Sequence, residues 1–584
     1  MKMRSADKKD IFRYIACLTA VIMMMTSCDA GKPASDTENG NTAGVGSSVE
    51  TAEQKNGEKI NSADEAQTEF YPQSKYTDFE CRTEAKDDAV SIDLDTVSSK
   101  SILTDGVVCS DGVMTVTKGG DYILSGTYNG RIVINTPEEK THLILNGIAL
   151  SADMSPICIE DADKVSLTLV DGTVNTVSDS ANYTFEEGED DPDAAIFSRE
   201  ALSINGNGTL VVNGNYDKGI FSKDSLKIIS GTLNVTSVGD AVKGKDYLLL
   251  KDGNITINAG EDGLKSNKDD NSEKGYVIIE GGDIKITCGD DGIHAETYLI
   301  VYDGNIDIDQ CYEGLEGAKV EIHGGVINVN ASDDALNAAS GSSTNEIDFY
   351  KSNMNFPDRS GSDDDNDRPE MPNGFSPDNM PDDFDPSSTP DDSSRPEKPD
   401  GAADNGGMGG KGGFGKREDG GFGGFGGGNS FGGGNNFNEP AEEGVYLLIT
   451  GGEITLTGGN DVIDSNGTFT QTGGSVTINN PNMSVYGEPD CIIDVNGDAV
   501  ISGGNFIANA GREGSGSEVF TTPHLSFSTG RLSGSYTVTD QSGSTVLTGE
   551  AVGASVIVIS SDKLISGEEY TLTIGEKTVT AEAE

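Results

Sequence analysis

Short apolar segments with alternating polar residues recur along this chain at a nearly constant spacing. In each repeat a glycine is followed by apolar residues at every second position, as in GDIKI at 282–286, and a second apolar segment such as YVII at 276–279 precedes the glycine. Alternation with a period of two indicates β-strands, and a fixed period of about 20 to 50 residues is typical of solenoids. The repeats begin, most often 22 residues apart, at Gly231, Gly253, Gly282, Gly304, Gly325, Gly452 and Gly474.

This spacing predicts an all-β fold in which one repeat forms one turn of a parallel β-solenoid, with about 22 residues per turn. Stacking turns at roughly 4.8 Å places like residues above one another. We therefore expect one interior column through Ile255, Ile284 and Ile306 and another through Ile279 and Val301. Each buried aliphatic side chain stabilises the stack by about 1.5 to 3 kcal/mol.

An acidic residue keeps the same phase in successive repeats, which places carboxylates about 5 Å apart. Such contacts are unfavourable unless a cation intervenes, and Ca²⁺ prefers six to eight oxygen ligands. The alternative is a solvated acidic edge relieved by Lys243, Lys265 and Lys268. The candidate calcium ligands are Asp240, Glu261, Asp262, Asp290, Asp291, Glu313, Asp333, Asp334 and Asp461.

The N-terminus predicts export. Basic residues precede an apolar run at 14–25 that is too short to span a bilayer, and this pattern is typical of a signal peptide at 1–27. The run ends in MTSC, which resembles a bacterial lipobox and predicts lipidation of Cys28. A polar segment at 28–85 then predicts a disordered tether, so we expect a protein anchored by lipid to the extracellular face of a bacterial cell membrane.

Composition divides the rest of the chain. Residues 341–443 are rich in Asp and Pro and then in Gly and Phe, which predicts a disordered insertion. It separates two solenoid segments at 86–340 and 444–512. Residues 513–584 lose the 22-residue period but keep the alternation of apolar and polar residues, which predicts a small C-terminal β cap.

The charge and the cysteines narrow the function classes. A net charge of -58 disfavours nucleic acid as a partner and favours divalent cations. Aromatic residues make up 6% of the chain and tryptophan is absent, which argues against a face that binds sugars mainly by ring stacking. The cysteines are widely scattered, which does not indicate a disulfide framework. We expect a monomer.

The sequences DGTVNTV, GDAVKGKD, DGNITINAGEDGLKSN and KGYVIIEGGDIKITCGDDGIHAET resemble those of the carbohydrate-binding domain-containing proteins of clostridia. The resemblance extends over about residues 90–575 and departs from the family in the long insertion and in Glu313, which replaces an aspartate. It implies a right-handed parallel β-helix shaped like pectate lyases, calcium binding, and non-catalytic attachment to plant polysaccharides such as cellulose and polygalacturonate.

Three functions remain open at this stage. We expect a non-catalytic, calcium-dependent polysaccharide-binding protein in which calcium bridges uronate sugars to the acidic residues. A polysaccharide lyase would need a base beside them, for which Lys243, Lys245 and Lys265 are the candidates. Ion pairing with Asp240 and Asp262 also explains Lys243 and Lys265. A structural stalk or adhesin is the third. The candidate ligand-binding residues are Lys243, Lys265, Tyr247, Tyr276 and Tyr298.

Overall fold

The structure is a computed structural model that describes residues 70–584 except 98–99, 186–187, 189–190, 342–439, 487–490 and 515–518. The predicted signal peptide, Cys28, most of the tether and most of the insertion lie outside the described residues. Within the part of the chain that is described, none of the helices combines the length and apolar character needed to cross a membrane. Almost all regular structure is β, so the prediction of an all-β protein is confirmed.

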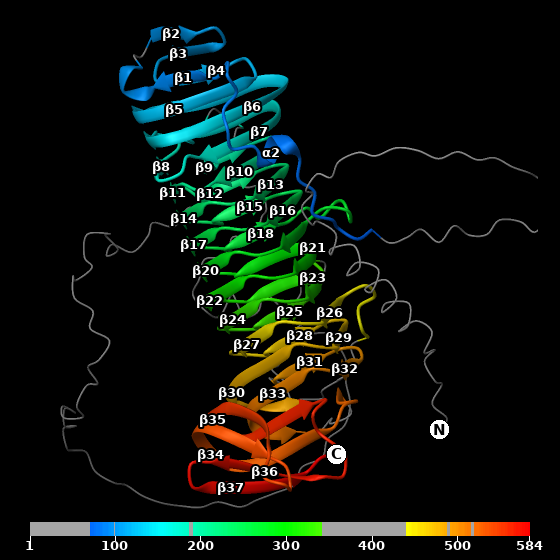
Figure 1. Cartoon of the computed structure of the whole chain (residues 1–584). Coiled ribbons are helices and arrows are strands. Elements are labelled where there is room, and N and C mark those ends of the chain that lie inside the picture. Colours follow the sequence, from blue (N-terminus) through cyan, green and yellow to red (C-terminus); the bar gives the residue numbers. More distant parts are fainter. Residues whose placement is uncertain are drawn as a thin grey trace, which may run out of the picture. The chain divides into compact units, whose positions relative to one another are not determined.

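The first part contains two short helices and eight strands. β2, β3 and β4 form an antiparallel meander, β1 pairs in parallel with β5, and the long strands β5, β6 and β7 pair in parallel (Figure 1). These elements are α2 (Asp78–Cys81), β1 (Val90–Asp93), η1 (Leu94–Thr96), β2 (Lys100–Thr104), β3 (Val107–Ser110), β4 (Val113–Val116), β5 (Gly120–Asn129), β6 (Arg131–Ser151), β7 (Ile157–Leu169) and β8 (Val174–Ser178).

The central part, residues 194–514, is a series of similar repeats that we call coils, and together they form the repeat stack. Its strands are β9 (Ala194–Ser198), β10 (Leu202–Gly206), β11 (Thr209–Gly214), β12 (Lys218–Ser222), β13 (Ser225–Ile228), β14 (Thr232–Ser237), β15 (Val242–Gly244), β16 (Tyr247–Leu250), β17 (Asn254–Asn258), β18 (Leu264–Ser266), β19 (Tyr276–Ile279), β20 (Asp283–Thr287), β21 (Ile293–Val301), β22 (Asn305–Cys311), β23 (Leu315–Ile322), β24 (Val326–Ala331), β25 (Leu336–Ala338), β26 (Tyr446–Ile449), β27 (Glu453–Thr457), β28 (Ile463–Ser465), β29 (Thr468–Gln471), β30 (Ser475–Tyr486), β31 (Ile493–Val495), β32 (Ala499–Ile501) and β33 (Asn505–Gly514).

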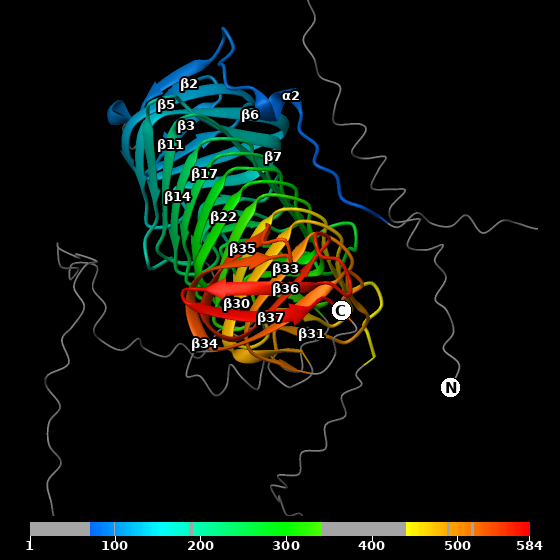
Figure 2. The ribbon, with the colours of Figure 1, turned by 60° about the horizontal axis from the view of Figure 1, so that its bottom comes forward.

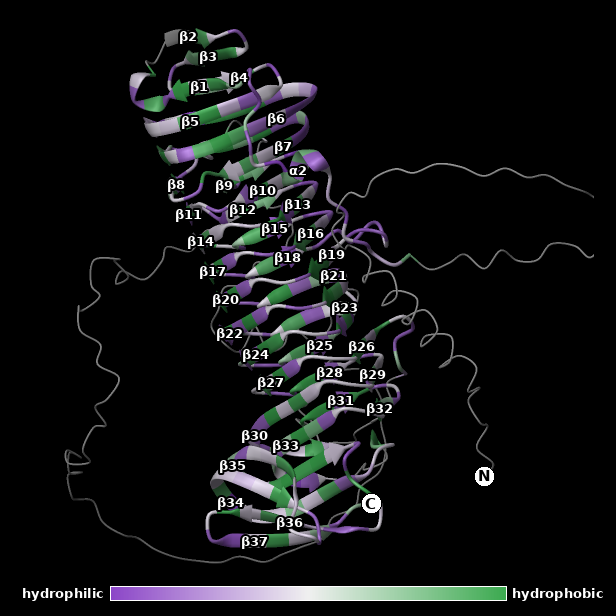
Figure 3. Ribbon diagram, in the orientation of Figure 1, coloured by the Kyte–Doolittle hydropathy of each residue, from purple (hydrophilic) through white to green (hydrophobic). Residues whose placement is uncertain are grey.

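Each strand of the repeat stack pairs in parallel with the equivalent strand of the next coil. Ile255 pairs with Ile284 and Ile284 with Ile306, and in the neighbouring column Ile279 pairs with Val301. These side chains are buried, with at most 1% of their surface exposed. Figure 3 shows the result as apolar positions repeated from coil to coil. The two columns of like residues expected from the spacing are therefore present in the register.

The glycine that opens each repeat is required by the close approach of neighbouring coils. Gly282 has φ +102°, and a Cβ added there would lie 2.9 Å from the carbonyl oxygen of Gly253 in the preceding coil. Gly253 and Gly325 also have positive φ, +137° and +92°, and an added Cβ would make the same close contact with the carbonyl oxygen of the repeat glycine before them. Glycine therefore serves both the left-handed corner and the distance between coils.

Both interruptions of the period enter at the same point of the repeat, between a corner strand and the strand that follows it. Residues 267–275 separate β18 from β19, and residues 339–445 separate β25 from β26. The strand β23 pairs with both β25 and β26, so the coil continues after the second interruption in the register it had before.

The last four strands pack differently. They are β34 (His524–Thr539), β35 (Thr545–Ser561), β36 (Glu569–Ile574) and β37 (Lys577–Glu582). They pair with one another and with β33 in antiparallel register and enclose a second apolar cluster around Phe527, Tyr536 and Leu572. Figure 2 shows these strands in front of the coils, at the end of the repeat stack.

Residues 70–86 run along the outer face of the strands from β21, which contacts Phe70, past β13, which contacts Lys75, to β5, which contacts Arg82. We call this segment the strap. Residues 70–85 were predicted to belong to the disordered tether, but they make defined contacts with the strands. Tyr298 Oη donates to the carbonyl oxygen of Phe70 at 2.9 Å, and Tyr71 Oη donates to Glu321 Oε2 at 2.8 Å. Aromatic residues of the strap thus cover apolar positions that the strands present on their outer face, around Leu249, Ile278 and Ile300.

The other end of the strap is fixed by ion pairs. Thr77 and Glu80 form a reciprocal capping box that starts α2, and Glu80 Oε1 lies 2.5 Å from Lys164 Nζ and 2.9 Å from Lys227 Nζ. Arg82 makes two hydrogen bonds to the buried Asp121. Burial alone would raise the pKa of Glu80, but the hydrogen bonds from both lysines outweigh it and lower the pKa to about 2.

We predict that Gly282→Ala destabilises the protein by about 1 to 3 kcal/mol, because alanine is strained at positive φ and its methyl group meets the preceding coil. Gly147→Ala is the matched control, since Gly147 has φ +75° but its added Cβ would meet nothing within 4 Å. Denaturant unfolding measures both variants. Equal losses would show that the approach of the coils contributes nothing.

We predict that Glu80→Gln releases the strap and costs about 3 to 5 kcal/mol, because it leaves two lysines without their shared carboxylate. The pKa of Glu80 is lower in the folded state, about 2 against 4.5, so this stabilisation is present above pH 4.5 and is lost as the pH falls toward 2. Hydrogen exchange of residues 70–86 at neutral and acidic pH measures it. The exposed Glu84→Gln should behave as wild type at both pH values.

Candidate metal centre

The predicted acidic residues lie at one corner of successive coils, directly before the corner strand. The backbone builds this column: the N–H of Gly263 donates to the carbonyl oxygen of Asp291 at 2.9 Å, and that of Gly292 donates to the carbonyl oxygen of Glu313 at 2.9 Å. We call the set the acid column, and it consists of Asp240, Asp262, Asp291, Glu313, Asp334 and Asp461.

The acid column is buried rather than exposed at an edge. Its side chains have 0% to 8% of their surface exposed. Several of them accept a hydrogen bond from the backbone of the next coil: Asp291 N–H donates to Asp262 Oδ1 at 2.9 Å, and Asp461 N–H donates to Asp334 Oδ1 at 2.9 Å. A solvated acidic edge therefore does not describe these residues.

Two lysines neutralise the first two acids of the column. Lys243 Nζ lies 2.8 Å from Asp240 Oδ2, and Lys265 Nζ contacts Asp262 Oδ2 and lies 3.9 Å from Asp240 Oδ1. Burial would raise the pKa of Asp240, but the two ammonium groups outweigh it and lower the pKa. Lys268 pairs instead with Asp270, whose side chain is exposed.

In the third coil a histidine takes the place of the lysine. His294 Nδ1 contacts Glu316 and lies 3.2 Å from Asp291 Oδ2. Burial would lower the pKa of His294, but the carboxylates of Glu316 and Asp291 outweigh it and raise the pKa well above its usual value. The two carboxylates therefore favour the protonated imidazole.

The next two coils bring carboxylates together. Glu313, Asp333 and Asp334 each offer an oxygen, and these three atoms lie within 4.8 Å of one another. The pKa of Asp334 is raised to about 9 by burial and then by the nearby charges of Asp464, Asp333 and Asp461. Burial and the charge of Glu316 likewise raise the pKa of Glu313 well above its usual value. Such a site is costly without a proton or a cation.

Two further groups meet the same distance criterion. They are Asp262 with Asp290 and Asp291, and Asp291 with His294 and Glu316. Of the predicted ligands, Asp240, Glu261 and Asp461 fall outside the three groups found among the described residues. Glu261 lies near Asp240 and Asp217, and burial together with these charges raises its pKa to about 7.

A second column of residues lies beside the acid column. The sequence analysis recognised its first two members, Lys243 and Lys265, but not the members that follow them. From Lys243 to Asp464 each member lies three residues after an acid of the column, and the last member, Asp494, lies three residues after Cys491. The members pair from coil to coil, so the signal was present in the spacing. In order along the chain the second column consists of Lys243, Lys265, His294, Glu316, Asn337, Asp464 and Asp494.

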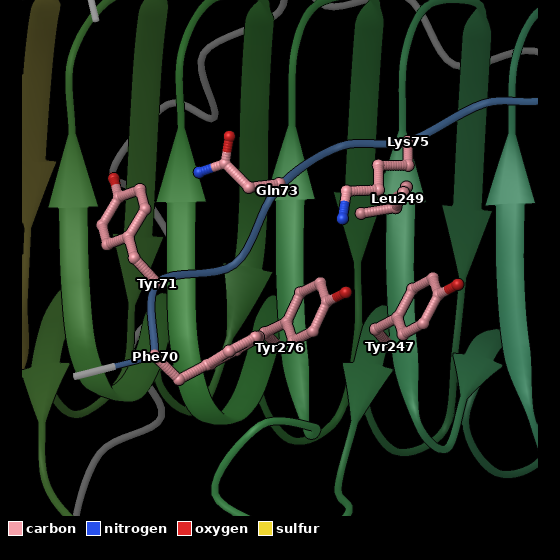
Figure 4. A pocket seen from close by; sticks show the side chains of 7 residues that line it. All are labelled: Phe70, Tyr71, Gln73, Lys75, Tyr247, Leu249 and Tyr276. Carbon is pink, nitrogen blue, oxygen red and sulfur yellow. The ribbon is translucent and has the colours of Figure 1, made fainter. Parts of the chain in front are cut away.

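The predicted ligand-binding tyrosines lie on a different strand position and are partly covered. The rings of Tyr247 and Tyr276 stack with centroids 4.9 Å apart, and Phe70 of the strap lies against Tyr276. A cavity of about 280 Å³ remains between the strap and these rings, lined also by Tyr71, Gln73, Lys75 and Leu249 (Figure 4). The structure thus gives the tyrosines a role in holding the strap.

Comparison with known proteins identifies part of the chain. The family model of the carbohydrate-binding domain-containing proteins matches residues 110–353. This segment belongs to the carbohydrate-binding domain-containing family. The match is shorter than the expected 90–575, but it contains the acid column from Asp240 to Asp334.

One curated protein and one solved structure are similar to this chain. A carbohydrate-binding domain-containing protein of Acetivibrio thermocellus is 37% identical over 150 residues, which are 25% of this chain and 52% of that protein. The chain thus spans about half the length of this curated relative. A solved structure of the polysaccharide lyase-like protein from C. thermocellum, a gadolinium derivative, is 33% identical and covers 41% of this chain and 92% of that one, with a TM-score of 0.36.

We predict that, in the presence of a chelator, the free energy of unfolding falls as the pH rises from about 4 to 9. Asp262 and Asp291 have pKa values of about 6 and Asp334 of about 9, chiefly because of burial. An unfolded aspartate has a pKa of about 3.9, so in this range the folded state binds more protons, and stability is lost as they dissociate. Denaturant unfolding at several pH values measures the slope.

The matched variant is Asp334→Asn, which keeps the shape of the side chain and removes its proton equilibrium. Between pH 6 and 9 it should lose less stability than wild type by at least about 1.4 kcal/mol, the equivalent of one pKa unit. An unchanged slope would contradict the assignment of the raised pKa to Asp334.

Proposed function

We propose that this protein binds polysaccharides without cleaving them and that binding depends on calcium held at the acid column. The supporting observation is the group Glu313, Asp333 and Asp334, whose three oxygens lie within 4.8 Å and two of whose members are buried. The family match to residues 110–353 supports carbohydrate as the partner. On this proposal the parallel coils form a right-handed β-helix whose long side accommodates a chain of sugars.

The chemistry of the group favours calcium over magnesium. Ca²⁺ accepts six to eight oxygens in a flexible arrangement, whereas Mg²⁺ requires a small octahedral shell and retains several waters. Carboxylates from adjacent coils supply several oxygens at spacings set by the strand register. The cation would replace the protons that otherwise hold Asp334 and Glu313 neutral.

A bridging cation also explains how an acidic protein would bind an acidic glycan. The chain carries a net charge of -58, so direct contact with a uronate polymer is repulsive. Calcium bound to carboxylates on one side retains ligand positions for the carboxylate of a uronate sugar on the other. We therefore favour polygalacturonate, with cellulose as the neutral comparison.

The lysines beside the acid column support binding rather than cleavage. A lyase needs a neutral base to take a proton beside the uronate carboxyl. Lys265 contacts Asp262, and although burial lowers its pKa, the charges of Asp262 and Asp240 outweigh it and raise the pKa well above the usual value. Lys243 is held 2.8 Å from Asp240. Neither ammonium group is arranged to act as a base.

We place the protein, as a monomer, at the extracellular face of the bacterial cell membrane through a lipid on Cys28. The motif at residues 25–28 supports this proposal, and Cys28 lies outside the described residues. The strap then joins the tether to the repeat stack. Replacing Cys28 with serine should release the protein from cells, which fractionation measures.

We predict that calcium at about 100 times its Kd stabilises the protein by roughly 2.7 kcal/mol for each site that binds only the folded state. Chelation should lower the melting temperature and abolish retention on polygalacturonate, and magnesium should restore little. The double variant Asp333→Asn, Asp334→Asn should behave as chelated wild type. Asp303→Asn is the control, because Asp303 is exposed and lies in the same stretch of repeats.

The same assay distinguishes the alternatives. Calcium-dependent retention with no unsaturated product supports the proposal. Release of unsaturated sugars would replace it with a lyase, and unchanged melting and retention after chelation would remove calcium from the function.

A further inference from the structure

The acid column and the column three residues after it change together along the repeat stack. In the coils of Asp240 and Asp262 the second position is lysine, and in the coil of Asp291 it is histidine. In the coils that follow it is Glu316, Asn337, Asp464 and Asp494. The second column thus passes from cations to neutral and acidic side chains, whereas the acid column keeps an aspartate or a glutamate in every coil from Asp240 to Asp461.

The lysines occupy the position that a bound cation would take. Lys265 Nζ contacts Asp262 Oδ2 and lies 3.9 Å from Asp240 Oδ1, so one ammonium group serves the acids of two coils. Through its contact with Asp262 it also brings a positive charge to the group formed by Asp262, Asp290 and Asp291. A divalent ion in that group would compete with a covalently attached cation already in place.

In the coil of Asp334 the equivalent residue is Asn337, which does not compete with a divalent ion for the carboxylates. Its side chain is 8% exposed, and its Nδ2 donates to Glu313 Oε2 at 2.7 Å. Its Oδ1 is buried and makes no hydrogen bond within the described part of the chain. A carboxamide held in this way presents an unpartnered oxygen beside Glu313, and an amide oxygen is a ligand that Ca²⁺ accepts.

We propose that the residue three positions after each acid decides whether that coil takes a divalent cation. Lys243 and Lys265 act as built-in counter-ions and exclude it, whereas Asn337 adds its Oδ1 to the ligands from Glu313, Asp333 and Asp334. This inference rests on the proposed binding of calcium to the acid column, and it assigns that binding to particular coils.

The test exchanges the two kinds of residue in the purified protein and measures calcium binding by isothermal titration calorimetry. Asn337→Lys places an ammonium group three residues after Asp334, as in the lysine coils. It should weaken binding at this site by roughly 10- to 100-fold or more while circular dichroism stays unchanged. Asn337→Asp, which keeps an oxygen at the position, should retain binding.

The reciprocal variant is Lys265→Gln, which removes the counter-ion from the group of Asp262, Asp290 and Asp291. It should bind at least one more calcium than wild type, and calcium should restore the melting temperature that the variant loses without it. Loss of packing alone would give no such restoration. Lys268→Gln is the control, because Lys268 pairs with Asp270 outside the column.

The outcomes separate this inference from the proposed function. If wild type binds no calcium, both are overturned. If wild type binds calcium but Asn337→Lys, once folded, binds it equally well, or Lys265→Gln gains no calcium, the assignment to particular coils is overturned and the proposed function stands. Should Asn337→Lys fail to fold, the stoichiometry of Lys265→Gln decides alone.

Discussion

The parallel register between coils places each side chain directly above its equivalent in the next coil, and the other features of this protein depend on that constraint. Where the repeated residue is aliphatic, as at Ile255, Ile284 and Ile306, the register produces a continuous buried column. Where it is glycine, it allows backbones to approach closely. Where it is acidic, it brings like charges together in a buried place, and that cost must be offset.

The chain offsets the cost of its acid column in more than one way. Backbone N–H groups donate to Asp262 and Asp334, and lysines pair with Asp240 and Asp262. Around Glu313 and Asp334 the neighbouring position supplies no such ammonium group, and burial together with nearby carboxylates raises the pKa values of both acids. A bound cation would stabilise the protein most at the acids that have no ammonium partner, so the distribution of the lysines indicates the cation sites better than the number of acids does.

The strap shows a different use of the outer face of the strands. Tyr276 and Tyr298 contact Phe70 and hold residues 70–86 against the repeat stack, while Glu80 and Arg82 fix the other end through buried ion pairs. Tyr276 and Tyr298, which were candidate ligand-binding residues in the sequence, thus contact another part of the same chain. A carbohydrate partner is then better placed at the acidic corner.

The sequence by itself determined the all-β fold, the columns of like residues, the two points of interruption and the phase of the acids. These properties are periodic, and a period is visible in a single sequence because each repeat has the same residue types at equivalent positions. Even the column from Lys243 to Asp464 was available at three residues after each acid, although only its lysines were recognised. The tertiary structure alone decided that the acids are buried, that Asn337 reaches Glu313, and that the strap covers the tyrosines. These depend on contacts between residues that are 24 to 228 positions apart, and no local pattern records which distant side chains will meet.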